Sequence, residues 1–217
     1  MKNTFIFTAF LFSFVSQMQG QTYSLASSTQ AYSTLQNDTI LSDSGWVGKL
    51  YPIAMPFPIR ISSTTISAIF INSDGQIMRK LTQGGFTFYR SLIYGFGNCG
   101  LRQKQGDTSQ ISFVTEGVSP NRITKIQFRN AGFVGDETHS DKINFQVWLH
   151  ESGKLYELRY GPKTVVPIRA MNGAYGPFLG IGAQYMRGTP ASPLLGTLDY
   201  GMNGIPDSGR VYRFSRP

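Results

Sequence analysis

The chain has 217 residues, and its 20 Lys and Arg outnumber its 12 Asp and Glu to give a formal net charge of +8 at pH 7. Only 15% of the residues are charged, whereas 24 are glycine and 13% are aromatic. This composition is typical of a chain of many short strands and turns. Because the basic residues are scattered rather than clustered in runs, we expect no nucleic-acid binding.

The first 20 residues predict an export signal. Lys2 precedes an apolar run from Phe5 to Val15, and Gly20 follows as a plausible cleavage point, with Ser16 as the alternative. A membrane anchor is the competing interpretation, but the apolar run is too short to span a bilayer comfortably. We therefore expect a signal peptide at 1–20. The mature chain would be exported to the periplasm, the outer surface or the extracellular space, and would lack a transmembrane segment.

The first half of the mature chain predicts short strands separated by polar turns. A proline-rich stretch, YPIAMPFPIRI, favours extended chain and excludes helix. An Asp-Gly turn between two apolar runs predicts a hairpin. The predicted strands cover residues 46–51, 66–71 and 76–81, with weaker candidates at 23–25 and 32–35.

The segment from Gly84 to Arg102 is the least regular part of the sequence. It predicts one short strand at 91–94 followed by loop, and its aromatic residues suit the core first and a binding loop second. Cys99 is the single cysteine, so no intramolecular disulfide can form. Since no basic partner adjoins it in sequence, we expect a buried, unreactive thiol.

Residues 121–161 predict three consecutive antiparallel strands. Apolar and polar side chains alternate in each of them, so one face of the sheet covers a core. A tight turn at 151–154 contains a glycine suited to positive φ. In the middle strand the apolar set is Ile143, Phe145, Val147 and Leu149.

Further strands are predicted at 111–116, 164–168, 178–183 and 211–214, and residues 188–204 resemble a linker. No window shows a sustained helical period. The sequence therefore predicts an all-β fold. We expect a single antiparallel β-sandwich of jelly-roll type over 21–217, with about 10–13 strands and little or no helix.

Several of these elements together resemble a β-sandwich module of exported Bacteroidetes proteins, distantly similar to the nidogen-like extracellular domain. The resemblance implies an extracellular module near the start of longer secreted or surface proteins, and it brings no catalytic residues with it. It extends from about Tyr23 to Phe214. Its elements are Phe57-Pro58, Ile69 to Gly75, Ile123 to Ala131, Ile143 to Val147, Leu155 to Gly161, and Leu179 to Gly182.

The sequence offers no constellation that predicts catalysis. No two acids are spaced i, i+2 on a strand, as a paired-carboxylate site would require, and no Gly-x-Ser-x-Gly elbow is present. We expect a non-enzymatic protein without cofactor or metal. One polar loop leaves open a hard-cation site, although its spacing fits no standard calcium loop. The acids and histidine of that loop are Asp136, Glu137, His139 and Asp141.

The outward face of the three strands is the predicted binding surface. Trp148 alternates out of the apolar stripe, so it is either an exposed anchor or core beneath another layer. The leading hypothesis is a binding or assembly module whose partner is an envelope or surface protein. A lectin-like polysaccharide binder and a small envelope hydrolase are the alternatives. The candidate binding residues are Trp148, Lys125, Arg129, Arg159 and His150.

Overall fold

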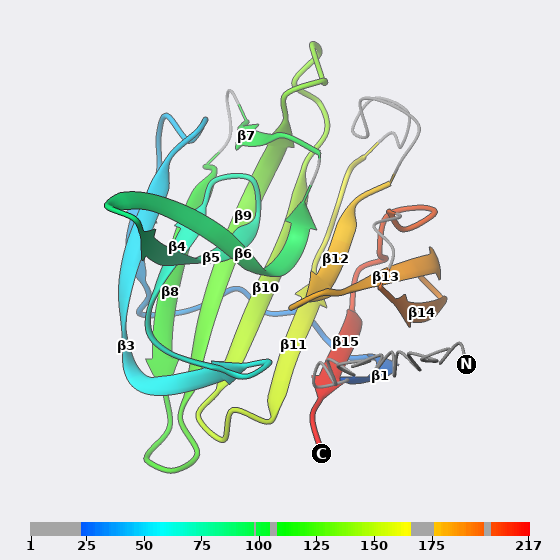
Figure 1. Cartoon of the computed structure of the whole chain (residues 1–217). Coiled ribbons are helices and arrows are strands. Elements are labelled where there is room, and N and C mark those ends of the chain that lie inside the picture. The colour runs from blue at the N-terminus through cyan, green and yellow to red at the C-terminus, as the bar shows by residue number, and fades with distance from the viewer. Residues whose placement is uncertain (1–22, 98, 105–107, 166–175, 198–200) are drawn as a thin grey trace, which may run out of the picture.

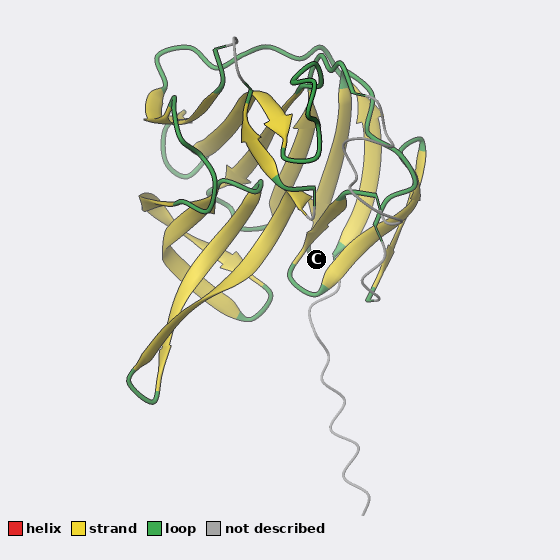
Figure 2. Ribbon diagram, turned by 90° about the horizontal axis from the view of Figure 1, so that it is seen from above, coloured by secondary structure: helices red, strands yellow, loops and turns green. Residues whose placement is uncertain are grey.

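The structure is a computed structural model that describes residues 23–97, 99–104, 108–165, 176–197 and 201–217 (Figure 1). The described residues contain fifteen strands and no helix, and the strands form two antiparallel sheets. The sheets lie face to face as a sandwich (Figures 1 and 2), which confirms the predicted fold class. There are more strands than expected because the alternation of apolar and polar residues did not predict the short edge strands. No helix in this part of the chain could cross a membrane.

The first sheet, sheet A, has eight strands and contains the three that the sequence predicts best. Its seven-strand path ends at β1 and β2, and a short β7 pairs with β9 off that path. In path order the strands are β1 (Ser24–Thr29), β15 (Arg210–Ser215), β11 (Leu155–Tyr160), β10 (Ile143–His150), β9 (Ile123–Phe133), β8 (Gln110–Glu116) and β2 (Thr39–Ser42), with β7 (Leu101–Gln103) beside β9.

The second sheet, sheet B, has seven strands. The proline-rich stretch forms its edge strand, β3. Prolines are tolerated there because an edge strand can leave backbone positions unpaired. In order the strands are β14 (Ser192–Gly196), β13 (Gln184–Thr189), β12 (Phe178–Ile181), β6 (Phe86–Gly97), β5 (Gln76–Gln83), β4 (Thr64–Asn72) and β3 (Leu50–Ile61).

Each sheet is built around a meander of four consecutive strands. Strands β3 to β6 are successive neighbours in sheet B, and strands β8 to β11 are successive neighbours in sheet A. A jelly roll would instead carry successive strands between the sheets. The turns follow the expected chemistry, since Gly75 and Gly153 both have positive φ at their hairpins.

The core lies between the two sheets and follows the predicted alternation. Ile143, Phe145, Val147 and Leu149 on β10 have no solvent-exposed surface. The ring of Phe128 stacks on that of Phe145 with centroids 4.6 Å apart and planes 7° apart. These inward side chains make sheet A the larger wall of one shared core.

The irregular segment after Gly84 was wrongly predicted to be mostly loop. Residues 86–97 form the long strand β6, whereas the sequence predicts only 91–94. Its glycines serve close packing, because a Cβ on Gly95 would lie 2.8 Å from the Phe145 ring. Cys99 is buried as predicted, and burial raises the pKa of its thiol to about 12.

Other boundaries also differ from the prediction. The stretch 188–204 is not a linker throughout, since β14 pairs with β13 inside it. The strand expected at 46–51 begins at Leu50, and Trp46 is buried in the preceding turn. The predicted signal peptide at 1–20 lies outside the described residues, as does most of the strand predicted at 164–168.

Candidate functional site

A strap of backbone crosses the outer face of sheet A and covers part of the predicted binding surface. The strap is residues 30–37, which connect β1 to β2 and form no strand. The backbone N–H of Leu35 donates to Gln127 Oε1, and Gln146 Nε2 donates to the Ser33 carbonyl. Gln127 and Gln146 are each only 1% exposed as a result. The outward face is therefore not one open surface, because the strap meets the side-chain amides that alternation places there.

Glu157 lies at the centre of a cluster of charged side chains on the outer face of sheet A. The residue is 4% exposed, and its carboxylate accepts hydrogen bonds from Arg159 Nη1 at 2.9 Å and Arg213 Nε at 3.0 Å. His150 Nε2 lies 3.8 Å from the same carboxylate. A buried carboxylate between two guanidinium groups is a structural ion-pair network, and breaking it leaves charge without compensation. Two of the five predicted binding residues thus belong to this network.

Trp148 is partly buried beneath two cations, which neither sequence alternative describes. Lys125 Nζ lies 4.3 Å from its ring centroid, and the Arg159 guanidinium carbon lies 4.0 Å away. Its indole N–H donates to Gln146 Oε1 at 2.8 Å. The cation–π contacts hold the ring against sheet A. The face of the Trp148 ring is therefore covered by side chains of the protein itself. A ring that binds sugar would instead be open to the ligand.

The surroundings of His150 lower the pKa of its imidazole. Burial lowers the pKa of the imidazole, and the positive charges of Arg213, Arg159 and Lys125 lower it further. The nearby carboxylate of Glu157 acts in the opposite direction and raises it. Protonation would add a positive charge to a cluster that already holds three cations.

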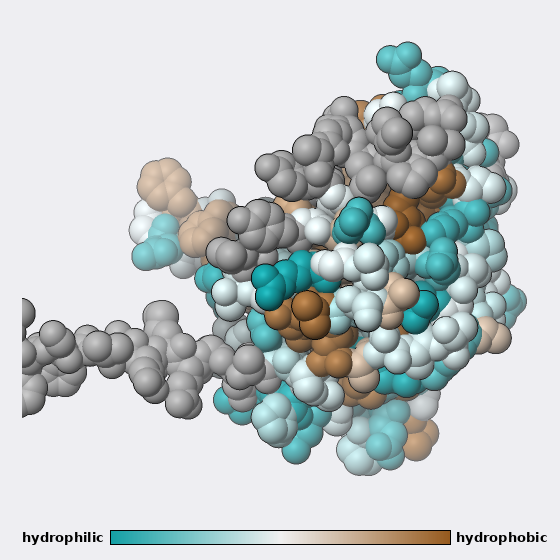
Figure 3. Space-filling model, turned by 90° about the vertical axis from the view of Figure 1, so that its right-hand side faces the viewer, coloured by the Kyte–Doolittle hydropathy of each residue, from teal (hydrophilic) through white to brown (hydrophobic). Residues whose placement is uncertain are grey.

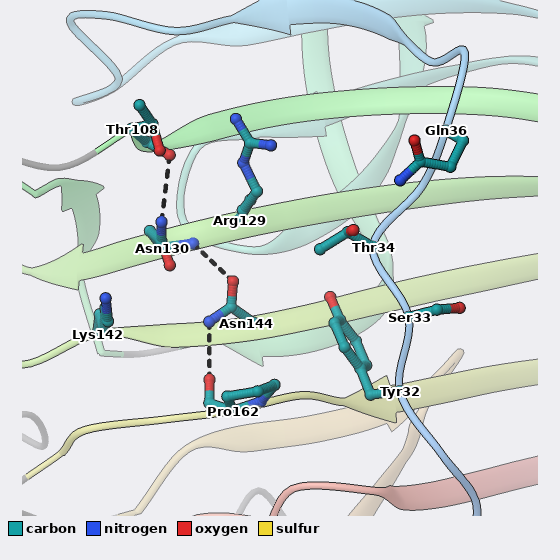
Figure 4. Close-up of a pocket in the computed structure, with 10 residues that line it drawn as sticks. All are labelled: Tyr32, Ser33, Thr34, Gln36, Thr108, Arg129, Asn130, Lys142, Asn144 and Pro162. Atoms are coloured by element: carbon teal, nitrogen blue, oxygen red, sulfur yellow. Dashed lines mark hydrogen bonds between the residues drawn. The ribbon is translucent and has the colours of Figure 1, made fainter.

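The fifth predicted residue, Arg129, lies apart from this cluster in a pocket of about 760 Å³. The strap forms one wall of the pocket, and the rest comes from strands β9 and β10, from Lys142 before β10, and from the segments that precede β8 and follow β11 (Figure 4). The Arg129 Nε is buried and has no hydrogen-bond partner among the described residues. The pocket-lining residues are Tyr32, Ser33, Thr34, Gln36, Thr108, Arg129, Asn130, Lys142, Asn144 and Pro162.

A chain of hydrogen bonds fixes the floor of this pocket. Asn144 Oδ1 accepts from the backbone N–H of Asn130 at 2.9 Å, and Asn144 Nδ2 donates to the Pro162 carbonyl at 2.7 Å (Figure 4). The strap is held close by Gly161, where a Cβ would lie 2.6 Å from the Tyr32 ring. The pocket is thus a pre-formed feature with its polar groups held in place.

The chemistry of the pocket lining is polar and cationic. Two cations, Arg129 and Lys142, accompany hydroxyl and amide side chains, and none of the described lining residues carries a carboxylate, a thiol or an imidazole. Such a lining can accept hydroxyl and anionic groups from a ligand. It offers no acid–base pair within the part of the chain that the structure describes.

The acidic loop at 135–141 buries Asp136 and Asp141, whereas Glu137 is exposed. Asp136 is buried, and its carboxylate accepts hydrogen bonds from Thr138 and from the backbone N–H of Asp141. Burial alone raises the pKa of Asp136, but these hydrogen bonds outweigh it and hold the pKa at about 2. Among the described residues, no group of three or more His, Cys, Asp or Glu could hold a metal ion. The carboxylate stabilises its own loop.

One known family matches nearly the whole chain, and not only the residues of the pocket. A family described as NIDO related matches residues 22–216. The chain belongs to the NIDO-related family. No curated protein and no solved structure matches it. The family assignment confirms the nidogen-related part of the resemblance, and NIDO-related domains are modules of an extracellular type. The Bacteroidetes origin is not shown by this match.

In this NIDO-related domain, the sequence pattern identified Arg129, one of the two cations of the pocket. It did not identify the strap that forms one wall of the pocket. Arg129 follows from strand alternation, because it points away from the core. The strap residues gave no periodic signal, and 32–35 was read as a weak strand. Gly161 was the available clue, since a glycine directly after a strong strand permits close approach of another segment.

Proposed function

We propose that this NIDO-related chain is a non-catalytic extracellular module that binds an acidic polysaccharide in the Arg129 pocket. Residues 1–20 act as its signal peptide in this proposal, and export places the pocket where such polymers occur. The proposal selects the lectin-like alternative over the protein-partner hypothesis.

The observation that carries the proposal is an unsatisfied donor on the cation inside the pocket. Among the residues that the structure describes, none accepts a hydrogen bond from the buried Nε of Arg129, although most buried polar groups in folded proteins are hydrogen-bonded. A bound carboxylate would accept two hydrogen bonds from the guanidinium group. The neighbouring hydroxyl of Thr34 and amide of Gln36 suit sugar hydroxyls.

The cations around Trp148 differ from Arg129, because they already have partners inside the domain. Lys125 and Arg159 lie over the indole, and Arg159 also donates to Glu157. Their charges are already compensated inside the domain. A ligand at that cluster would have to displace internal partners, whereas a ligand at Arg129 supplies a missing one.

The absence of a reactive group in the described pocket lining favours binding over hydrolysis. Glycoside hydrolysis ordinarily requires two carboxyl groups facing one cleft. A protein partner would require a larger contact, on the order of 800 Å² on each side. The pocket at about 760 Å³ instead has the volume of a small-ligand site, which suits a few sugar units.

The test is a glycan array that carries uronic-acid and neutral polysaccharides, probed with the mature protein. We expect binding to the acidic polymers that Arg129→Ala reduces by at least about tenfold, the loss expected for a charged hydrogen-bonded contact. Arg187→Ala is the matched control, because Arg187 is exposed on β13 and lies outside the pocket.

Two results would contradict the proposal. One is equal binding of neutral and acidic polymers with no effect of Arg129→Ala. The other is an array without signal together with capture of a defined protein partner, which would restore the assembly hypothesis.

A further inference from the structure

A long β-hairpin leaves sheet B and projects beyond the sandwich. Strand β5 pairs with β4 only through Met78, and β6 pairs with β12 only from Ile93 onward. Beyond these points β5 and β6 pair with each other alone, from Arg79 opposite Arg90 to Gln83 opposite Phe86. The ribbon stands out at the lower left of Figure 2. It lies on the sheet opposite the one that forms the Arg129 pocket.

The end of this hairpin is a tight turn and exposes aromatic side chains. Gly84 and Gly85 have φ of +59° and +81°, which is the pattern of a tight two-residue turn. Phe86 is 78% exposed and Phe88 is 42% exposed. In Figure 3 apolar atoms stand apart from the body on the left, where the hairpin projects. Large apolar side chains at such a tip, rather than scattered singly, indicate an interaction site.

Strand register places these rings and two cations on one face. Leu81 pairs with Phe88 and Gln83 with Phe86, while Arg79 pairs with Arg90 nearer the base. Side chains two positions apart share a face. Two arginines directly opposite each other repel, which costs stability unless an anion lies between or beside them.

The charge of the whole region has one sign. No Asp or Glu occurs from Gly75 to Gly106, and Lys80 adds a further exposed cation on the other face of the ribbon. From the tip inward, the order is therefore aromatic rings and then positive charge. The spacing between Phe86 and Arg90 along the strand is roughly 13 Å.

We propose that this hairpin tip inserts into the surface of an anionic lipid bilayer. Apolar side chains of interfacial proteins enter about 5–10 Å into the boundary between headgroups and acyl chains. Phe86, Phe88 and Leu81 would occupy that layer, and the exposed Arg90 would meet the phosphate groups above it. Arg79 is partly buried and its Nη1 donates to the uncharged Thr64 hydroxyl at 3.1 Å, so the lipid phosphates would supply the negative charge that compensates the opposed arginines.

A narrow ribbon suits a bilayer better than a protein partner. Stable protein interfaces bury on the order of 800 Å² on each side, and a two-stranded tip with a two-residue turn presents much less. A lipid surface needs only insertion of the tip and electrostatic attraction of the flanking cations.

The test is co-sedimentation of the mature protein with vesicles of phosphatidylcholine, alone or mixed with phosphatidylglycerol. We expect binding to the mixed vesicles, and we expect Phe86→Ser with Phe88→Ser to weaken it by at least about tenfold. Arg90→Gln should reduce the preference for the anionic mixture. Val118→Ser is the matched control, because Val118 is also 78% exposed but lies on a distant turn.

Three outcomes would overturn the proposal. They are no binding to either vesicle, binding to the mixed vesicles that the Phe86 and Phe88 substitutions leave unchanged, and self-association that those substitutions abolish. The last would make the tip an interface between copies of the chain. Thermal unfolding of each variant verifies that the sandwich is intact, which is expected because every substituted side chain is at least partly exposed on the ribbon or turn.

Discussion

Replacing Glu157 with glutamine tests whether the charges on the outer face of sheet A are structural. Glutamine has nearly the same shape and keeps one oxygen that can accept from Arg159 or Arg213. It removes the negative charge that both hydrogen bonds use. The carboxylate side chain is only 5% exposed, so solvent cannot replace that charge readily.

The magnitude follows from the two hydrogen bonds. A hydrogen bond to a charged group contributes about 1.5–3 kcal/mol, against about 0.5–1.5 kcal/mol for a neutral one. Glutamine weakens one of the two bonds, which costs about 1–1.5 kcal/mol, and loses the other, which costs about 1.5–3 kcal/mol, because its NH2 group faces a guanidinium donor. The free energy of unfolding should therefore fall by about 2.5–4.5 kcal/mol, which for a domain of this length corresponds to a fall of roughly 5–18 °C in Tm.

Urea unfolding followed by far-UV circular dichroism measures this change. Glu116→Gln is the matched control, because Glu116 is 50% exposed and its ion pair with Lys125 is expected to contribute less than about 1 kcal/mol. Indole fluorescence should also change in the Glu157 variant, since Arg159 lies over the Trp148 ring. Equal, small losses in both variants would refute the reasoning and make the cluster an ordinary solvated surface.

Three further predictions concern the core, the stability at low pH and the strap. Phe128→Ala should lower the free energy of unfolding by about 3–5 kcal/mol in the same assay, because it empties a fully buried stack. The hydrogen bonds from Arg122 hold the pKa of Glu151 at about 2, below its ordinary value of 4.5. The stabilisation is therefore present above pH 4.5 and lost as the pH falls toward 2, and Glu151→Gln should flatten that part of the stability curve. Gly161→Ala should displace Tyr32 and weaken acidic-glycan binding while leaving the sandwich folded, whereas unchanged glycan affinity would show that the strap does not shape the pocket.

Local patterning predicted much of the fold. The alternation in β10 placed its four apolar residues in the core, and the glycine turns at Gly75 and Gly153 set the hairpins. These features depend on neighbours in sequence, which is why a single chain reveals them. Strand β6 was missed because Gly95 resembles a turn signal, although its function is to admit the Phe145 ring from the other sheet.

The candidate site was less predictable because it depends on a segment distant in sequence. Gln127 and Gln146 alternate outward and suggest a solvated face, yet both amides bond to the strap. The strap sequence has no periodic pattern that would predict this contact. Arg129 was identified by alternation, but sequence could not separate it from Arg159, whose charge is compensated by Glu157.

The central claim is that Arg129, and not the Trp148 cluster, receives the ligand. The most direct measurement is an NMR titration of the arginine Nε–Hε and tryptophan indole signals with an oligosaccharide of uronic acids. The account predicts that the Arg129 signal shifts in a saturable manner while the Arg159 and Trp148 signals stay in place. Shifts at Arg159 and Trp148 with none at Arg129 would contradict it.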